Sequence, residues 1–151
     1  MTKQMQLKVL TPEKTMFEGA IESLQIEICG EDEAGLQVTK TGERLGIFPG
    51  HQPMICPLVY GIVAAKLPGQ TTLQMAVMGG QCHTDGETVT ILSNSAELGS
   101  DLNLLRAQEA KNRAEARLKE QTESLDVTRA EQALHRALTR IKLSELLKMR
   151  K

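Results

Sequence analysis

Two hydrophobic patterns divide the chain near residue 100. Before this point, apolar and polar residues alternate in short runs, as at Met5, Leu7 and Val9. A period of two is typical of strands that bury one face. The runs predict strands at Gln4–Leu10, Ala20–Ile28, Leu36–Thr39, Met54–Val59, Gly61–Lys66, Thr71–Val77, Gly80–His83 and Glu87–Leu92. Because no helical pattern separates these strands, they predict an antiparallel β-sandwich or barrel.

Turn residues separate the predicted strands. Thr11–Lys14 and Thr41–Arg44 are expected to be turns, and the acidic run Gly30–Gly35 is expected to end a strand. Pro68-Gly69 supplies a reversal, and Asp85-Gly86 is a pair that two-residue hairpin loops favour. The body is therefore expected to be built from hairpins.

Beyond residue 100 the pattern is helical. Residues 101–151 contain no Gly, Pro or aromatic residue and are rich in strong helix formers. The apolar repeat is interrupted once, at 121–126, which predicts two antiparallel helices, and Ser100 is a candidate N-cap for the first. We expect a β-sandwich domain at 1–93, a linker at 94–100 and a helical hairpin arm at 101–151.

The predicted seam between the helices consists mainly of small residues. The first helix presents Ala107, Ala110, Ala114 and Leu118, and the second presents Val127, Ala130, Leu134, Ala137 and Ile141. Because alanine buries little area, such a seam holds weakly. We infer a hairpin that can open.

Charge follows the same division. Residues 1–100 carry six Lys/Arg against eleven Asp/Glu, and residues 101–151 carry twelve against eight. The arginines of the arm recur at helical spacing: Arg106, Arg113 and Arg117 in the first helix, Arg129, Arg136 and Arg140 in the second. At about 100° per residue, each triplet forms a basic stripe. Such a stripe suits phosphate or an acidic partner, whereas a solvated helix face is the simpler alternative.

The cysteines and the hydropathy indicate the compartment. Cys29, Cys56 and Cys82 are odd in number and set among apolar neighbours, which favours buried, reduced thiols and a cytoplasmic protein. No segment approaches the ~18–20 apolar residues that cross a bilayer. A role at a membrane would therefore need another subunit as anchor.

The sequence contains no recognisable catalytic constellation. Cys82-His83 is the only adjacent Cys/His pair, and no CxxC, HxxxH or HExxH spacing supports a metal there. GxxxxGK[ST] and GxGxxG are absent, which argues against a Gly-rich phosphate loop. Single-stranded nucleic acid is disfavoured because the basic stripes lack aromatic residues for stacking. We expect neither an enzyme nor a metal protein.

Six motifs follow one another along the chain. They are Thr11-Pro12-Glu13, Phe17-Glu18-Gly19, Leu45-Gly46-Ile47-Phe48-Pro49-Gly50-His51-Gln52-Pro53, Ala76-Val77-Met78-Gly79-Gly80, Val89-Thr90-Ile91-Leu92 and Asp101-Leu102-Asn103-Leu104-Leu105-Arg106-Ala107. In this order the motifs resemble the epsilon-subunit family of bacterial F-type ATP synthases. The run Leu45–Pro53 is the most specific of them. The resemblance covers nearly the whole chain.

The resemblance implies a non-catalytic subunit of the central stalk. The β-sandwich would bind the gamma subunit and the c-subunit ring, and the protein would lie peripherally at the cytoplasmic face of the plasma (inner) membrane. Residues implied at the gamma and c-ring interface are Glu43, Leu45, Phe48 and His51. The segment 30–44 is longer than the usual family loop, and Glu43 is our choice for its acidic contact.

The resemblance also gives the helical arm two roles. Extended, it would present Arg129, Arg136 and Arg140 to acidic segments of the beta subunits and inhibit ATP hydrolysis. Folded down, it would bind ATP as a regulatory ligand, with no cofactor required. The implied nucleotide-binding residues are Asn103, Arg106, Arg129, Arg136 and Arg140. Asn103 stands where the family motif has Asp, so this position has lost its negative charge. The alternative function for the chain is a stand-alone ATP-sensing module that uses the arginines of the hairpin.

Overall fold

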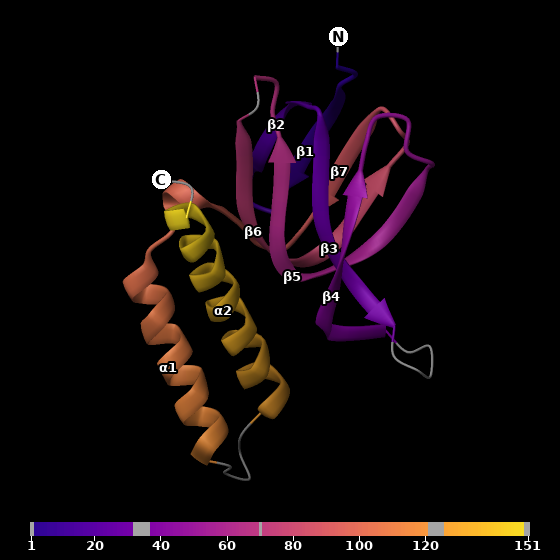
Figure 1. Cartoon of the computed structure of the whole chain (residues 1–151). Coiled ribbons are helices and arrows are strands. Elements are labelled where there is room, and N and C mark those ends of the chain that lie inside the picture. The colour runs from indigo at the N-terminus through magenta and orange to yellow at the C-terminus, as the bar shows by residue number, and fades with distance from the viewer. Residues whose placement is uncertain (1, 32–36, 70, 121–125, 150–151) are drawn as a thin grey trace. The chain divides into compact units, whose positions relative to one another are not determined.

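The computed structural model describes residues 2–31, 37–69, 71–120 and 126–149, without the side chains of 29–31 and 37–42. It consists of two compact units, Met1–Leu98 and Gly99–Lys151 (Figure 1). The first unit is a β-sandwich body and the second is a helical hairpin, which confirms the predicted fold class.

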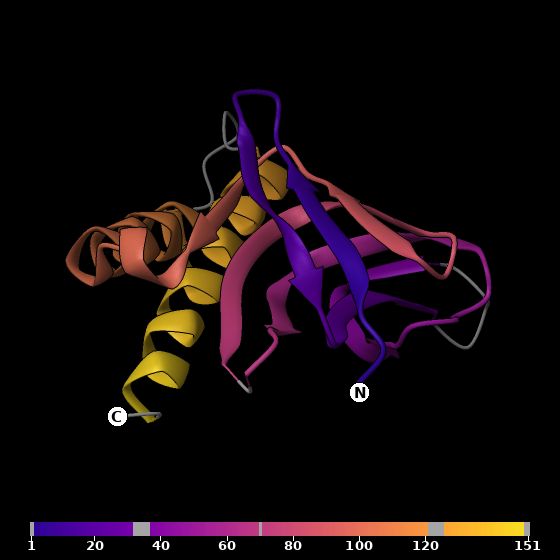
Figure 2. The same cartoon turned by 90° about the horizontal axis from the view of Figure 1, so that it is seen from above.

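Eight strands form the body. They are β1 (Met5–Leu10), β2 (Thr15–Ile21), β3 (Ser23–Glu31), β4 (Gln37–Ile47), β5 (Met54–Lys66), β6 (Thr72–Thr84), β7 (Thr88–Leu92) and β8 (Ala96–Leu98). Their order is β2-β1-β7-β6-β5-β3-β4, with β8 beside β6. Among these ladders only β1–β7 is parallel. In Figure 2 the indigo hairpin of β1 and β2 lies across the magenta strands, so that the two layers of the sandwich can be followed.

Strands β5 and β6 join the two layers. They pair along nearly their whole length, from Met54 opposite Thr84 to Lys66 opposite Thr72. On its other edge β6 pairs first with β8, around Ala76, and then with β7, from Gln81 onward. The part of β6 between its pairings with β8 and β7 includes Gly79 and Gly80, whose φ angles are +74° and +112°. Strand β6 thus changes its partner where the backbone has positive φ angles, which residues other than glycine rarely adopt.

The core of the body is aliphatic, as the sequence predicts. Met5, Leu7 and Val9 are buried on one face of β1, and the alternation of this strand is confirmed. Cys56 and Cys82 are free and buried, also as predicted, whereas the side chain of Cys29 lies outside the described residues. The sandwich therefore buries its thiols among aliphatic side chains.

Several strand boundaries were predicted wrongly. Each of β5 and β6 was divided into two predicted strands, but Gly61, Gly79 and Gly80 lie within continuous strands. The predicted turn at Thr41–Arg44 lies inside β4, because these residues pair with β3. Strand β2 was largely missed. Local turn residues were outweighed in each case by pairing with a neighbouring strand.

Part of the predicted linker is also strand. Of residues 94–100, Ala96–Leu98 form β8 and pair with β6. The predicted interruption at Gly30–Gly35 is only partly described, since β3 continues to Glu31 and residues 32–36 lie outside the described part. Asp85-Gly86 connects β6 to β7, which confirms that hairpin.

The second unit begins with the 3-10 turn η1 (Gly99–Asp101), followed by α1 (Leu104–Glu120) and α2 (Val127–Met149). Ser100 lies in η1 and does not cap α1 as predicted. The cap is Asn103, whose Oδ1 accepts a hydrogen bond of 3.0 Å from the Arg106 amide. Neither helix, within the described residues, is both long and apolar enough to cross a membrane.

Four of the nine predicted seam residues are buried. Ala107 and Ala114 on α1 and Ala130 and Ala137 on α2 are at most 4% exposed, whereas Val127 is 51% exposed. Val127 is the first residue of α2, where the helix has no preceding turn to pack beside it. The predicted seam is therefore confirmed at these four alanines, whereas its four remaining members besides Val127 are half-buried: Ala110, Leu118, Leu134 and Ile141.

Gly80→Ala should destabilise the body strongly. A Cβ at this position would overlap the backbone carbonyl oxygen of Leu92, and φ is +112°. We expect the free energy of unfolding to fall by about 3 kcal/mol or more, measured by urea denaturation. Gly69→Ala is the control, because φ is +87° there but no atom lies within 4 Å of the added Cβ. Equal losses for the two variants would show that the close approach of Gly80 to β7 does not matter.

Candidate functional site

The first candidate surface is the loop Phe48–Pro53, which we call the PGH loop. It is closed by a hydrogen bond of 3.0 Å from the His51 amide to the Phe48 carbonyl. The Gly50 amide donates to the Gly86 carbonyl at 2.9 Å, which ties the loop to the β6–β7 turn. The sequence Phe-Pro-Gly-His therefore forms a turn of defined shape.

The β6–β7 turn is itself fixed by a carboxylate. Asp85 Oδ1 accepts hydrogen bonds from the Thr88 amide at 2.7 Å and the Glu87 amide at 2.9 Å. These bonds lower the pKa of Asp85 because they favour its charged form. At pH values above this lowered pKa, the charged carboxylate of Asp85 stabilises the β6–β7 turn, to which the PGH loop is hydrogen-bonded.

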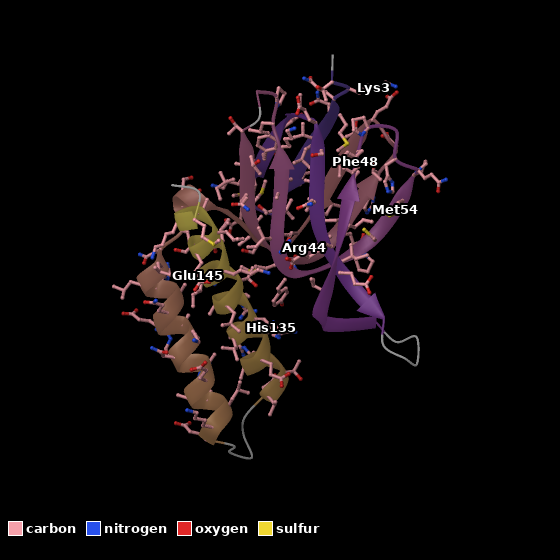
Figure 3. The ribbon with its side chains drawn as sticks, in the orientation of Figure 1. Lys3, Arg44, Phe48, Met54, His135 and Glu145 are labelled. Atoms are coloured by element: carbon pink, nitrogen blue, oxygen red, sulfur yellow. The ribbon has the colours of Figure 1, made fainter. Side chains whose placement is uncertain are left out.

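Two large apolar side chains are exposed at the ends of this loop. Phe48 is 62% exposed and Ile55, just inside β5, is 69% exposed. Figure 3 shows Phe48 and Met54 on the same side of the body. The Phe48 ring lies back over Gly46, with 3.2 Å between its nearest atom and the position a Cβ would take. Exposed aromatic and aliphatic groups on a rigid turn are typical of a binding surface.

The predicted interface residues do not all lie together. Phe48 and His51 both belong to the PGH loop, whereas Leu45 is half-buried against the core. Glu43 is exposed but lies five residues before Phe48 in β4, about 16 Å along an extended strand. Ile55, two residues beyond the PGH loop in β5, is exposed as well, and sequence reasoning missed it because it reads as an ordinary strand residue.

The second candidate surface is one side of the hairpin. Each arginine of the two triplets directly precedes a seam residue, as Arg106 precedes Ala107 and Arg136 precedes Ala137. On each helix the arginine is therefore rotated back by about 100° from the seam around the helix axis. Because the two helices run in opposite directions and face each other across their seams, this rotation brings the arginines of both helices to the same side of the hairpin. We call this side the basic face.

The arginines of the basic face form three levels along the hairpin. Each residue of a helix adds about 1.5 Å along the helix axis. The distance of an arginine from the helix connection is therefore obtained by counting residues back from Glu120 in α1 and forward from Val127 in α2. Arg117 and Arg129 lie about 4 Å from it, Arg113 and Arg136 about 12 Å, and Arg106 and Arg140 about 20 Å. Each level thus takes one arginine from each helix. Arg129 and Arg140 are separated by about 16 Å along α2.

Most carboxylates of the helices lie away from this face. Glu115, Glu131 and Glu145 lie on the opposite side by the same rotation, and Glu115 pairs with Lys111 at 3.9 Å. Among the described carboxylates, Glu120 and Asp126 approach the arginines beside the connection, and Glu109, which precedes the seam residue Ala110, lies between the levels of Arg106 and Arg113. The basic face consequently has a surplus of positive charge.

Two of the arginines occupy equivalent helix positions. Arg106 and Arg129 are third residues of their helices, and their amides donate to the capping oxygens of Asn103 and Asp126, both at 3.0 Å. The side-chain oxygen of Asn103 is therefore already engaged in capping α1. Cations at helix N-termini are disfavoured by the helix dipole, so an anion near either arginine would relieve this repulsion.

Catalytic and metal chemistry find no support in the described residues. His83 Nε2 lies 3.2 Å from Gln81 Oε1, and His51 Nδ1 lies 2.8 Å from the Gln52 carbonyl. Within these residues no group of three or more His, Cys, Asp or Glu side chains is placed to hold a metal ion. The surfaces that remain are suited to binding.

Family models match both units. Residues 4–99 match the β-sandwich domain of the ATP synthase delta/epsilon chain, and residues 100–145 match its long α-helix domain. Together the two matches span nearly the whole chain.

Similar proteins agree with these matches. The chain is 37% identical over 139 residues to a protein of Bacillus licheniformis, covering 92% of this chain and 96% of the relative. It is 38% identical over 142 residues to a protein of Bacillus pumilus, covering 94% and 98%. Both are named ATP synthase epsilon chain. A chain in the mitochondrial ATP synthase of Euglena gracilis shares the fold, with a TM-score of 0.70 at 19% identity over 90% of this chain and 78% of that one.

Proposed function

The chain belongs to the ATP synthase delta/epsilon chain family, and we propose that its helical hairpin is an arm that restrains ATP hydrolysis by the parent complex. The chain is an epsilon subunit of the central stalk and not a catalytic one, like the epsilon chains to which it is similar. The single observation that carries the inhibitory role is the basic face, on which six arginines share one side of the hairpin.

The partner of the basic face is an acidic segment of a catalytic beta subunit. Arginine grips carboxylates through two parallel hydrogen bonds, so levels of paired arginines can each take one carboxylate group. The small-residue seam holds the two helices together weakly, which lets the arm change its conformation. An arm bound to catalytic subunits would oppose rotation of the stalk.

The partners of the body are the gamma subunit and the ring of c subunits. Phe48 and Ile55 provide the exposed apolar contacts, and the PGH loop holds its shape through the Gly50–Gly86 hydrogen bond. The subunit is then peripheral, at the cytoplasmic face of the membrane. Other subunits hold it there.

Phe48→Ala should weaken assembly of the body. Truncating a rigid, exposed aromatic anchor removes most of the apolar contact it makes with a partner. We expect at least a tenfold loss of affinity for complex depleted of this subunit, about 1.4 kcal/mol, measured by surface plasmon resonance. Leu105→Ala is the control, since Leu105 is similarly exposed, at 67%, but lies on the arm. Unchanged affinity of Phe48→Ala would exclude the PGH loop from the interface.

Neutralising the basic face should release ATP hydrolysis. Replacing Arg129, Arg136 and Arg140 by Gln removes three charges from this side while keeping long polar side chains. We expect hydrolysis by the reconstituted complex to rise several-fold, because the arm loses its hold on carboxylates.

The matched control removes the same charge from the rest of the hairpin. Lys111, Lys119 and Lys142 lie on the opposite side, and their replacement by Gln should leave hydrolysis at the wild-type rate. If both triple variants activate hydrolysis equally, net charge and not the basic face is responsible. If neither does, the inhibitory role is wrong.

A second candidate function is ATP binding by the hairpin. It is favoured by Arg106 and Arg140, which share the level farthest from the connection, and by the position of Arg106 at a helix N-terminus. Arg129 lies at the level nearest the connection, about 16 Å from Arg140 along α2.

Titration calorimetry of the whole chain with ATP tests this function. We expect Arg140→Ala to abolish the binding heat and Arg129→Ala to leave the affinity unchanged. Absence of heat with the wild-type chain, or equal loss in both variants, would exclude a nucleotide site at this level.

A further inference from the structure

Two free thiols face each other across the central ladder of the body. Cys56 on β5 and Cys82 on β6 are direct partners in the antiparallel register. Direct partners point to the same face of a sheet, with Cα atoms about 4.5–5.5 Å apart. This separation lies within the ~4.4–6.8 Å range of disulfides. A bridge between these cysteines therefore needs no movement of the strands.

We propose that Cys56 and Cys82 form a redox-sensitive dithiol, which hydroperoxides convert into a disulfide across the β5–β6 ladder. This site is independent of the role of the chain in the central stalk. It lies on the body alone and involves neither the PGH loop nor the basic face.

The two thiols differ in their suitability as nucleophile. Cys56 is 8% exposed, whereas Cys82 is fully buried at 0%. A hydrogen bond from the Cys82 thiol lowers the pKa of Cys56, against the opposing effect of burial. The same interaction and its own burial raise the pKa of Cys82. Cys56 is thus the attacking thiol, and Cys82 keeps its proton until it resolves the intermediate.

The oxidation takes place in two steps. The Cys56 thiolate attacks one peroxide oxygen, the O–O bond breaks, and hydroxide leaves as Cys56 becomes a sulfenic acid. The Cys82 sulfur then attacks Cys56 Sγ, the S–S bond forms and the S–O bond breaks. The departing hydroxide takes the Cys82 proton. In all, two thiols and one hydrogen peroxide give one disulfide and two waters.

The position of the bridge determines what it constrains. Met54, Ile55, His83 and Thr84 line a hollow of about 580 Å³, and the cysteines are the next residues inward on both strands. A disulfide would fasten β5 to β6 directly below this hollow. Oxidation would therefore keep β5 and β6 from separating at this end of their ladder.

Peptide mapping of the wild-type chain tests the proposal. Trypsin cleaves after Lys and Arg, so the three cysteines fall on three different peptides, 15–40, 45–66 and 67–106. The folded chain is treated with hydrogen peroxide, its remaining thiols are blocked, and it is digested without reductant. We expect the intact chain to lose two hydrogen atoms and the peptides 45–66 and 67–106 to be linked until dithiothreitol is added.

Two serine variants test the order of the steps. In Cys82→Ser, dimedone should label a sulfenic acid on peptide 45–66, because no resolving thiol remains. In Cys56→Ser, peptide 67–106 should remain unlabelled. Circular dichroism checks that both variants fold, and the wild-type mapping stands without them.

Three results would overturn the proposal. One is a wild-type chain without a linked peptide after peroxide treatment. Another is a bridge that includes peptide 15–40. The third is labelling of Cys56→Ser as fast as that of Cys82→Ser, which would contradict Cys56 as the attacking thiol.

Discussion

The ladder between β5 and β6 is the interaction on which the body depends. These strands of 13 residues each are shared by both layers. Strand β3 pairs with β5, and β7 and β8 pair with β6. Gly80 allows β6 to pass from β8 to β7, because its missing Cβ would occupy the space of the Leu92 carbonyl. Downstream of this passage the β6–β7 turn holds the PGH loop through Gly86. The shape of the PGH loop is thus fixed in part by the backbone of the β6–β7 turn, which is remote from the loop in sequence.

In the hairpin, packing and electrostatics are two consequences of one spacing. Every arginine of the basic face is the immediate predecessor of a seam residue, so whatever aligns the seam also aligns the charges. Ala107 and Ala137 are almost fully buried, while Arg106 is exposed and Arg136 half-buried. A shift of one helix by a single residue would break the seam and scatter the arginines. The basic face is therefore as well defined as the packing beneath it.

The fold class and the burial of β1 and of the four seam alanines could be predicted from sequence, because periodicity reports directly which face is buried. The boundaries could not, because they depend on partners distant in sequence. Strand β2 contains Gly19 and Glu18 yet pairs with β1, and β8 exists because β6 offers it an edge. The cap of α1 shows the same limit. Ser100 and Asn103 are both good capping residues, and η1 decides between them. Similarly, spacing alone gives each basic stripe, but only the antiparallel pairing of α1 and α2 shows that both stripes share one side.

The weak seam and the concentrated charge of the hairpin act in opposite directions. Each buried alanine methyl contributes about 0.8 kcal/mol, so the seam gains little from each contact. Meanwhile arginines at the same level repel each other, and Arg106 and Arg129 also face the positive ends of their own helices. An anionic surface removes both repulsions at once, whereas a solvated hairpin keeps them. A segment built in this way gains more from binding carboxylates or phosphates than from its own packing. The arrangement therefore favours a hairpin whose conformation is decided by its partner.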